Sequence, residues 1–147
     1  MSEANKELIR RYQDAYNSNK LDVLDELLHP EWRTNAWPDG VPQSLDSAKA
    51  FYQAVQEVFS DVEYTTEDLI AEGDQVVQRW TFRARHTGEF IGLPPSGKTI
   101  TAAGISIFEV ADGKIVRHWA FADDLGFLHQ LGADVPAEWL AFGHRST

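Results

Sequence analysis

The amino-acid sequence predicts an α+β fold in which a curved antiparallel sheet forms a cone around N-terminal helices. Up to about residue 59, apolar residues recur at the spacing of helical faces. Beyond Ser60 they alternate with polar residues, which is the period of β-strands. Helices followed by long antiparallel strands are typical of α+β proteins. With 147 residues the chain can bury one substantial core, and we expect a single domain over residues 1–147.

Three helices are expected before the long strands. The first spans residues 4–17, where one face is apolar. A short second helix ends at His29-Pro30, because proline disfavours helical geometry in the residue before it. A short strand over residues 31–37 then leads to a third helix over residues 45–59.

Long strands are expected over residues 62–71, 75–86, 98–110 and 114–122. In the strand over residues 75–86 one face is mostly apolar and the other carries arginine and threonine. Such a split indicates that one side is packed and the other meets water. The packed face is expected to comprise Val76, Gln78, Trp80, Phe82, Ala84 and His86.

The last strand ends in two carboxylates, Asp123 and Asp124, directly before an apolar helix. Strict alternation along this strand puts His118 on one face. The other face is expected to be buried, and it carries Ile115, Arg117, Trp119, Phe121 and Asp123. A carboxylate among aromatic rings has a raised pKa, which makes it a usable general acid or base near neutral pH. Asp124 then caps the helix; the alternative is that Asp123 is the cap.

Composition excludes several classes of function. The formal net charge of −10 argues against a nucleic-acid partner. The N-terminal segment is polar, with neither a signal-peptide nor a membrane-spanning pattern, so we expect a cytoplasmic protein without a membrane partner. The chain has no cysteine and its histidines lack metal-ligand spacing, so we expect no metal site.

The interior of a cone closed at one end by helices is expected to bind a small apolar or polycyclic ligand. Its candidate lining residues are Tyr12, Trp32, Trp37, Phe51, Phe59, Trp80, Phe82, Phe90, Arg117 and Trp119. His86, just before a Gly- and Pro-rich loop, is a candidate catalytic partner of Asp123. The alternative is a histidine at a strand end that is hydrogen-bonded locally. His118 is expected at the surface or at an interface.

Three segments resemble known families. RYQDAYNSNKLDVLDELLHPEW is similar to the start of a nuclear transport factor 2-like (cystatin-like) domain. HTGEFIGLPPSGKTI and DGKIVRHWAFADDLGFLHQLG resemble the loop and the late H-W-x-x-x-D motif of SnoaL-like polyketide cyclases. The resemblance covers nearly the whole chain, and Asp123 is the residue that matches the aspartate of the late motif.

This resemblance implies a cofactor-independent enzyme that closes a ring by an intramolecular aldol reaction of a bulky, apolar carbonyl compound. Asp123 would be the general acid/base, and the protein would be a homodimer through the outer face of its sheet. Arg117 stands where the family commonly carries an acidic residue. Two alternatives remain: an epoxide hydrolase or ketosteroid-isomerase-like enzyme using the same pocket, or a non-catalytic ligand-binding or dimerisation module.

Overall fold

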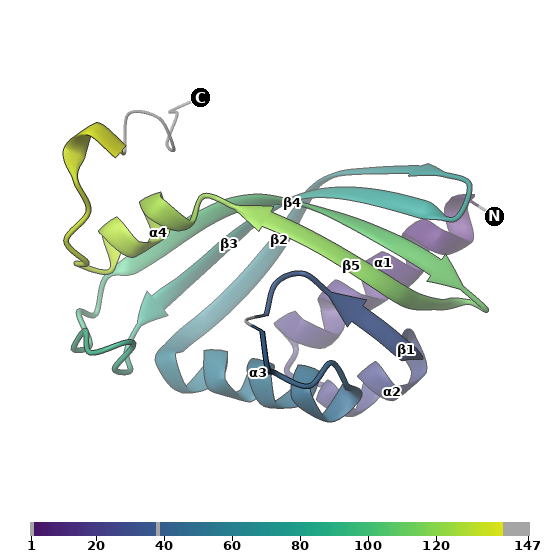
Figure 1. The fold of residues 1–147 in the computed structure, drawn as a ribbon, viewed down its shortest axis with the longest axis horizontal. Helices are drawn as coiled ribbons and strands as arrows, with labels where there is room; N and C mark the ends of the chain where they lie inside the picture. Colours follow the sequence, from purple (N-terminus) through teal and green to yellow (C-terminus); the bar gives the residue numbers. More distant parts are fainter. Residues whose placement is uncertain (1, 38, 140–147) are drawn as a thin grey trace.

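The computed structural model describes residues 2–37 and 39–139 (Figure 1). It has the expected α+β order, with helices first and long strands after them. The elements are α1 (Ser2–Asn17), the 3₁₀ turn η1 (Leu21–Val23), α2 (Leu24–Leu27), β1 (Leu28–Thr34), α3 (Leu45–Val58), β2 (Phe59–Glu72), β3 (Gln75–His86), β4 (Thr99–Ala111), β5 (Lys114–Ala122) and α4 (Asp124–Gln130).

The strands form one curved, unclosed sheet in the order β1-β5-β4-β3-β2. Strands β2 to β5 pair antiparallel, as predicted, but β1 pairs parallel with β5. The helices α1, α2 and α3 lie on one side of the sheet, and α4 follows the end of β5 (Figure 1). No helix among residues 2–37 and 39–139 is long and apolar enough to cross a membrane.

Strand boundaries differ from the prediction where helix and strand join without a loop. β1 begins at Leu28 and includes Pro30, which the sequence predicted to lie before the strand. Proline is tolerated because β1 is an edge strand, where a missing N–H need not break a ladder bond. β2 likewise begins at Phe59, whose backbone is already extended immediately after the last residue of α3.

A β-bulge in β5 reverses the predicted faces of this strand. Glu109 pairs with Arg117, whereas its neighbour Val110 pairs with Ile115, so Val116 is an extra residue in β5. Ile115 is fully buried, and beyond the bulge the inward positions are His118, Ala120 and Ala122. The inward placement predicted for Arg117, Trp119 and Phe121 is therefore wrong, and Phe121 is 72% exposed.

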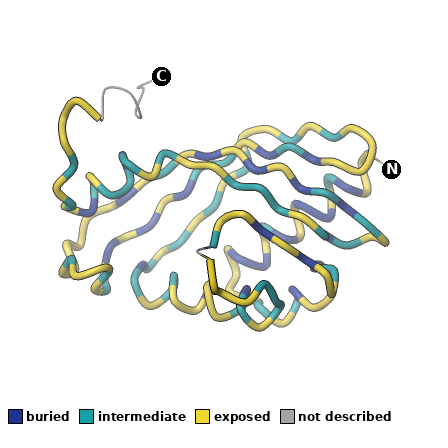
Figure 2. The backbone as a smooth tube through the Cα atoms, in the orientation of Figure 1, coloured by how far each residue is buried: buried dark blue, intermediate teal, exposed yellow. Residues whose placement is uncertain are grey.

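Buried and exposed residues alternate along β3 and β4 (Figure 2). The inward face predicted for β3 is confirmed, since its residues are buried apart from the half-buried Trp80. The buried side chains form two clusters. One joins α1, α2 and β1 to the sheet, and the other comprises Phe59, Phe82, Ala84, Ile100 and Leu131.

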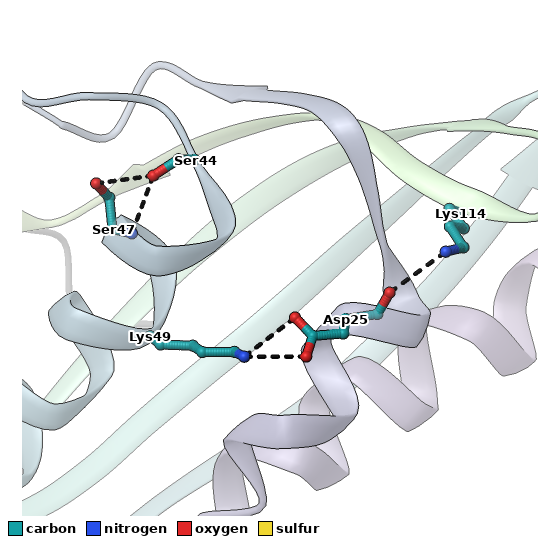
Figure 3. Close-up of polar contacts among 5 residues, drawn as sticks. All are labelled: Asp25, Ser44, Ser47, Lys49 and Lys114. Carbon is teal, nitrogen blue, oxygen red and sulfur yellow. Dashed lines mark hydrogen bonds and ion pairs between the residues drawn. The ribbon is translucent and has the colours of Figure 1, made fainter.

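Polar contacts hold the short helix α2 between α3 and β5 (Figure 3). Lys49 of α3 lies 3.0 Å from the Asp25 carboxylate, and Lys114 of β5 donates to the Asp25 carbonyl oxygen at 3.3 Å. Helix α3 begins with a side-chain cap, because Ser44 Oγ accepts a hydrogen bond from Ser47 N at 3.1 Å. These contacts fix the position of α3, which contributes one wall of the cavity described next.

Candidate functional site

A cavity of about 320 Å³ lies on the inner side of the sheet, bounded by α1, β1, α3 and the inward residues of β3, β4 and β5. Ligand pockets in proteins range upward from roughly 300 Å³. Of the candidate lining residues from the sequence, the cavity wall includes Tyr12, Trp32, Trp37, Phe51 and Trp80. Its other lining residues are Gln13, Tyr16, Thr34, Ala36, Ala48, Tyr52, Tyr64, Gln78, Ser106, Phe108, His118, Ala120, Ala122 and Asp124.

One wall of the cavity is aromatic. The rings of Trp32 and Trp37 meet edge to face at 5.1 Å between centroids, and Phe51 lies 6.1 Å beyond Trp37. The segment that carries Trp37 is anchored by Gln43, whose amide exchanges hydrogen bonds of 2.7 and 2.8 Å with the backbone of Thr34. This wall offers flat apolar surface to a ligand with fused rings.

A second group consists of three buried tyrosines and the half-buried Tyr64. The hydroxyl groups of Tyr12 and Tyr16 lie 2.7 Å apart, Tyr16 stacks on Tyr52 at 3.1 Å between centroids, and the Tyr64 ring lies 6.3 Å from that of Tyr16. Burial raises the pKa of each of these phenols above its usual value of 10.0. The tyrosines therefore stay protonated and act as uncharged hydrogen-bond donors.

Polar side chains of α1, β2 and β3 form a closed cluster beside the tyrosines. Gln78 Nε2 donates to Gln13 Oε1 at 2.7 Å and to Thr66 Oγ1 at 2.8 Å, and Thr66 donates to Gln13 Oε1 at 2.7 Å. Gln78 is only 6% exposed. Because a buried amide must be hydrogen-bonded, this cluster fixes the orientation of the amide groups of Gln13 and Gln78 at the cavity wall.

His118 lies in the wall of the cavity, although the sequence placed it on the surface. Its ring stacks on Phe108 at 4.3 Å between centroids, and its Nε2 lies 3.0 Å from Ser106 Oγ. Trp80 Nε1 donates to the same oxygen at 2.9 Å. Burial lowers the pKa of His118 to about 4, so the imidazole is neutral at neutral pH.

The orientation predicted for the two carboxylates is wrong. Asp123 Oδ1 accepts a hydrogen bond from Gly126 N at 3.0 Å and caps α4, which is the alternative that the sequence left open. Asp124 is exposed and lines the cavity, so it lies at the open end. The bulge in β5 is the cause, since it makes even-numbered residues face inward from His118 onward. A catalytic role of Asp123 stays a prediction from the resemblance.

The other candidate residues lie outside the cavity. His86 is fully buried in the second cluster, where Ser96 N donates to its Nδ1 at 3.3 Å and Phe59 lies 6.0 Å from its ring. Phe59, Phe82 and Phe90 pack there with Phe127 of α4, which fills this end of the sheet. Arg117 and Trp119 share the outer face, with the guanidinium 5.9 Å from the Trp119 ring.

Sequence reasoning missed several polar residues of the cavity, chiefly Ser106, His118 and Asp124. Gln78 carried a usable signal, because it is a polar residue on a strand face that is otherwise apolar. Over residues 2–37 and 39–139, no group of three or more His, Asp or Glu side chains is arranged to hold a metal ion.

Comparison with known sequences finds relatives that are all described as cyclases. The family model described as SnoaL-like polyketide cyclase matches residues 6–131. The chain is 31% identical over 134 residues to aklanonic acid methyl ester cyclase DnrD of Streptomyces peucetius, covering 88% of this chain and 92% of that protein. It is 30% identical over 127 residues to nogalonic acid methyl ester cyclase of Streptomyces nogalater, covering 83% of this chain and 92% of that protein.

Solved structures agree with these relatives. TsrD from Streptomyces laurentii superposes with a TM-score of 0.81 at 34% identity, covering 89% of this chain and 96% of that one. IdmH from Streptomyces antibioticus superposes with a TM-score of 0.77 at 31% identity, covering 88% of this chain and 99% of that one. The fold is of the nuclear transport factor 2-like type, and the chain belongs to the SnoaL-like polyketide cyclase family.

Proposed function

We propose that this protein closes a ring by a cofactor-independent intramolecular aldol reaction of a bulky, mostly apolar carbonyl compound. The observation that carries the proposal is the cavity of about 320 Å³, in which an aromatic wall faces uncharged hydrogen-bond donors and a carboxylate lies at the open end. Two relatives are cyclases of aklanonic and nogalonic acid methyl esters. We therefore propose a methyl ester of this kind as the substrate class.

The reaction needs a base and a place for negative charge. A carboxylate removes a proton from carbon next to a carbonyl group, and the resulting enolate carbon attacks a second carbonyl carbon of the same molecule. A C–C bond forms, the C=O π electrons move to oxygen, and the alkoxide takes the proton back from the carboxylic acid. Asp124 is the carboxylate in the cavity lining, and we assign it the acid/base role. The aromatic wall holds the chain in its folded, reactive conformer.

The neighbouring aspartates provide a matched pair of variants. Aklanonic and nogalonic acid methyl esters are incubated with the wild-type protein, Asp124→Asn and Asp123→Asn, and ring closure is followed by chromatography. We expect Asp124→Asn to lose roughly 10²–10⁴-fold in kcat, the usual contribution of a general acid/base. Asp123→Asn keeps a side-chain oxygen that can cap α4, and we expect it to retain turnover.

Each other outcome has a definite meaning. Loss of turnover in folded Asp123→Asn, with Asp124→Asn active, would return the acid/base role to Asp123. Binding of the esters without turnover by the wild-type protein would favour the ligand-binding module over the cyclase. Hydrolysis or isomerisation products in place of a new ring would identify the alternative enzyme classes.

We also propose that the protein forms a homodimer through the outer face of the sheet. Ile105 and Phe121 are cross-strand neighbours there and are 50% and 72% exposed. Such an apolar surface is typical of an interaction site. Light scattering should give the dimer mass for the wild-type protein and the monomer mass for Phe121→Glu. Ile91→Glu, at an exposed residue between β3 and β4, serves as the control. A cytoplasmic location stays a prediction from the sequence.

A further inference from the structure

The indole of Trp80 lies directly over the backbone of Gly104, its partner on the neighbouring strand. A Cβ atom at Gly104 would come within 2.3 Å of Trp80 Cζ2 and 2.7 Å of Trp80 Cε2. Glycine is required here because of this close approach. The ring position brings Trp80 Nε1 to 2.9 Å from the hydroxyl oxygen of Ser106, two positions further along β4.

The direction of the hydrogen bonds follows from the chemistry of the groups. An indole N–H only donates, so Ser106 Oγ accepts from Trp80. Ser106 is 2% exposed, and within the described part of the chain the remaining neighbour of its hydroxyl group is His118 Nε2 at 3.0 Å. The Ser106 hydroxyl hydrogen has an acceptor among these groups only when Ser106 donates to Nε2, and a buried hydroxyl group without an acceptor is costly.

A neutral imidazole carries a single proton, so an Nε2 atom that accepts leaves the proton on Nδ1. The His118 ring stacks on Phe108 and forms no ion pair with any of the described residues, and both facts favour the neutral imidazole. Nδ1 has no hydrogen-bond partner within residues 2–37 and 39–139, yet it is not one of the fully enclosed unpaired atoms. His118 is half-buried and forms part of the cavity wall, so Nδ1–H is available to a ligand.

We propose that Gly104, Trp80 and Ser106 fix His118 as a neutral Nδ1–H donor that hydrogen-bonds the substrate oxygen on which negative charge develops. This role rests on the proposed aldol function. Trp80 and Ser106 are positioning residues, whereas His118 is the group that touches the substrate. A neutral donor that is already oriented stabilises an enolate or alkoxide oxygen without reorganisation during the reaction. The proton stays on Nδ1, so the proton balance of the ring closure is unchanged.

The test is NMR of the free protein labelled with ¹⁵N-histidine. Long-range ¹H–¹⁵N spectra identify the tautomer of each ring, and His118→Gln assigns the His118 signals. We expect the Nδ1–H tautomer in the wild-type protein at neutral pH, and a mixture of tautomers in Ser106→Ala. Ser106→Thr, which restores a hydroxyl group, should restore the single tautomer. Exposed His129 should be the same in all of them.

Trp80→Phe provides a second, independent perturbation, since it keeps an aromatic ring over Gly104 and removes the indole donor. This variant should also show a mixture of His118 tautomers. Its spectrum keeps the proposal testable if Ser106→Ala does not fold. A wild-type Nε2–H tautomer, or a tautomer that neither variant changes, would overturn the proposal.

Activity is a separate readout. On an ester that the wild-type protein cyclises, we expect His118→Gln to lose roughly 10²–10³-fold in kcat, as for an oxyanion donor. Ser106→Ala should lose roughly tenfold in kcat with little change in KM. Full activity of both variants would refute the oxyanion role even with the expected tautomer. If the wild-type protein turns over no ester but gives the expected NMR result, the proposed function is contradicted, whereas the Nδ1–H tautomer of His118 is confirmed.

Discussion

The side-chain amide of Asn35 pairs with both backbone polar groups of Ala120. Ala120 N donates to Asn35 Oδ1 at 2.8 Å, and Asn35 Nδ2 donates to Ala120 O at 3.3 Å. Thr34 is the last residue of β1 in register with β5, opposite His118. The amide therefore continues the pairing of these two strands beyond the end of β1, next to the cavity wall.

Asn35→Ala should lower the free energy of unfolding by about 1–2 kcal/mol, because it removes two hydrogen bonds of this edge. Urea denaturation measures the change. Asn35→Asp keeps the acceptor for Ala120 N and loses the donor, so its stability should lie between those of Asn35→Ala and the wild type. Equal stability of Asn35→Ala and the wild type would mean that water replaces the amide at no cost.

Gly126 and Asp123 should be energetically coupled. A Cβ at Gly126 would lie 2.2 Å from Asp123 Oδ2 and so displace the capping carboxylate. Losing a cap costs about 1 kcal/mol, while replacing a helical glycine by alanine gains about as much. We therefore expect Gly126→Ala to be nearly neutral in the wild-type protein and stabilising by about 1 kcal/mol in Asp123→Ala. A double-mutant cycle measured by urea denaturation tests this, and strict additivity would contradict it.

His118 should make the protein less stable in acid. Its pKa is about 4 in the folded protein and 6.5 in the ordinary case. Between these values the unfolded chain binds a proton that the folded one does not, so stability is lost as the pH falls. The slope approaches about 1.4 kcal/mol per pH unit for this group. His118→Phe should reduce the slope of unfolding free energy against pH in this window, as measured by urea denaturation at a series of pH values.

The phenols should resist ionisation until the protein unfolds. The chain has 4 tyrosines, of which Tyr12, Tyr16 and Tyr52 are buried and Tyr64 is half-buried beside them. Because their folded pKa values are raised, the stability that they contribute is present below about pH 10 and is lost above it. Phenolate absorbance at about pH 10 should be low in the folded protein and half-maximal in urea. A native titration like that of free tyrosine would contradict the burial of these hydroxyl groups.

Local patterns in the sequence were enough for the order of the helices and strands and for the inward face of β3, where regular alternation continues from Val76 to His86. They were not enough for β5. The bulge at Val116 depends on how β5 pairs with β4. Ile115 and Val116 are both β-branched and apolar, so the sequence does not indicate which of them is the extra residue. The limits of the cavity depend on tertiary packing too, since Phe127 of α4 covers Phe59 and Phe82.

The bulge at Val116 also has an evolutionary consequence. Deletion of the Val116 codon would leave the pairs on either side unchanged, with Ile115 opposite Val110 and Arg117 opposite Glu109, so His118, Ala120 and Ala122 would still face the cavity. The bulge therefore absorbs one inserted residue without moving the cavity wall. Relatives can gain or lose a residue at this point and keep the same side chains in the cavity.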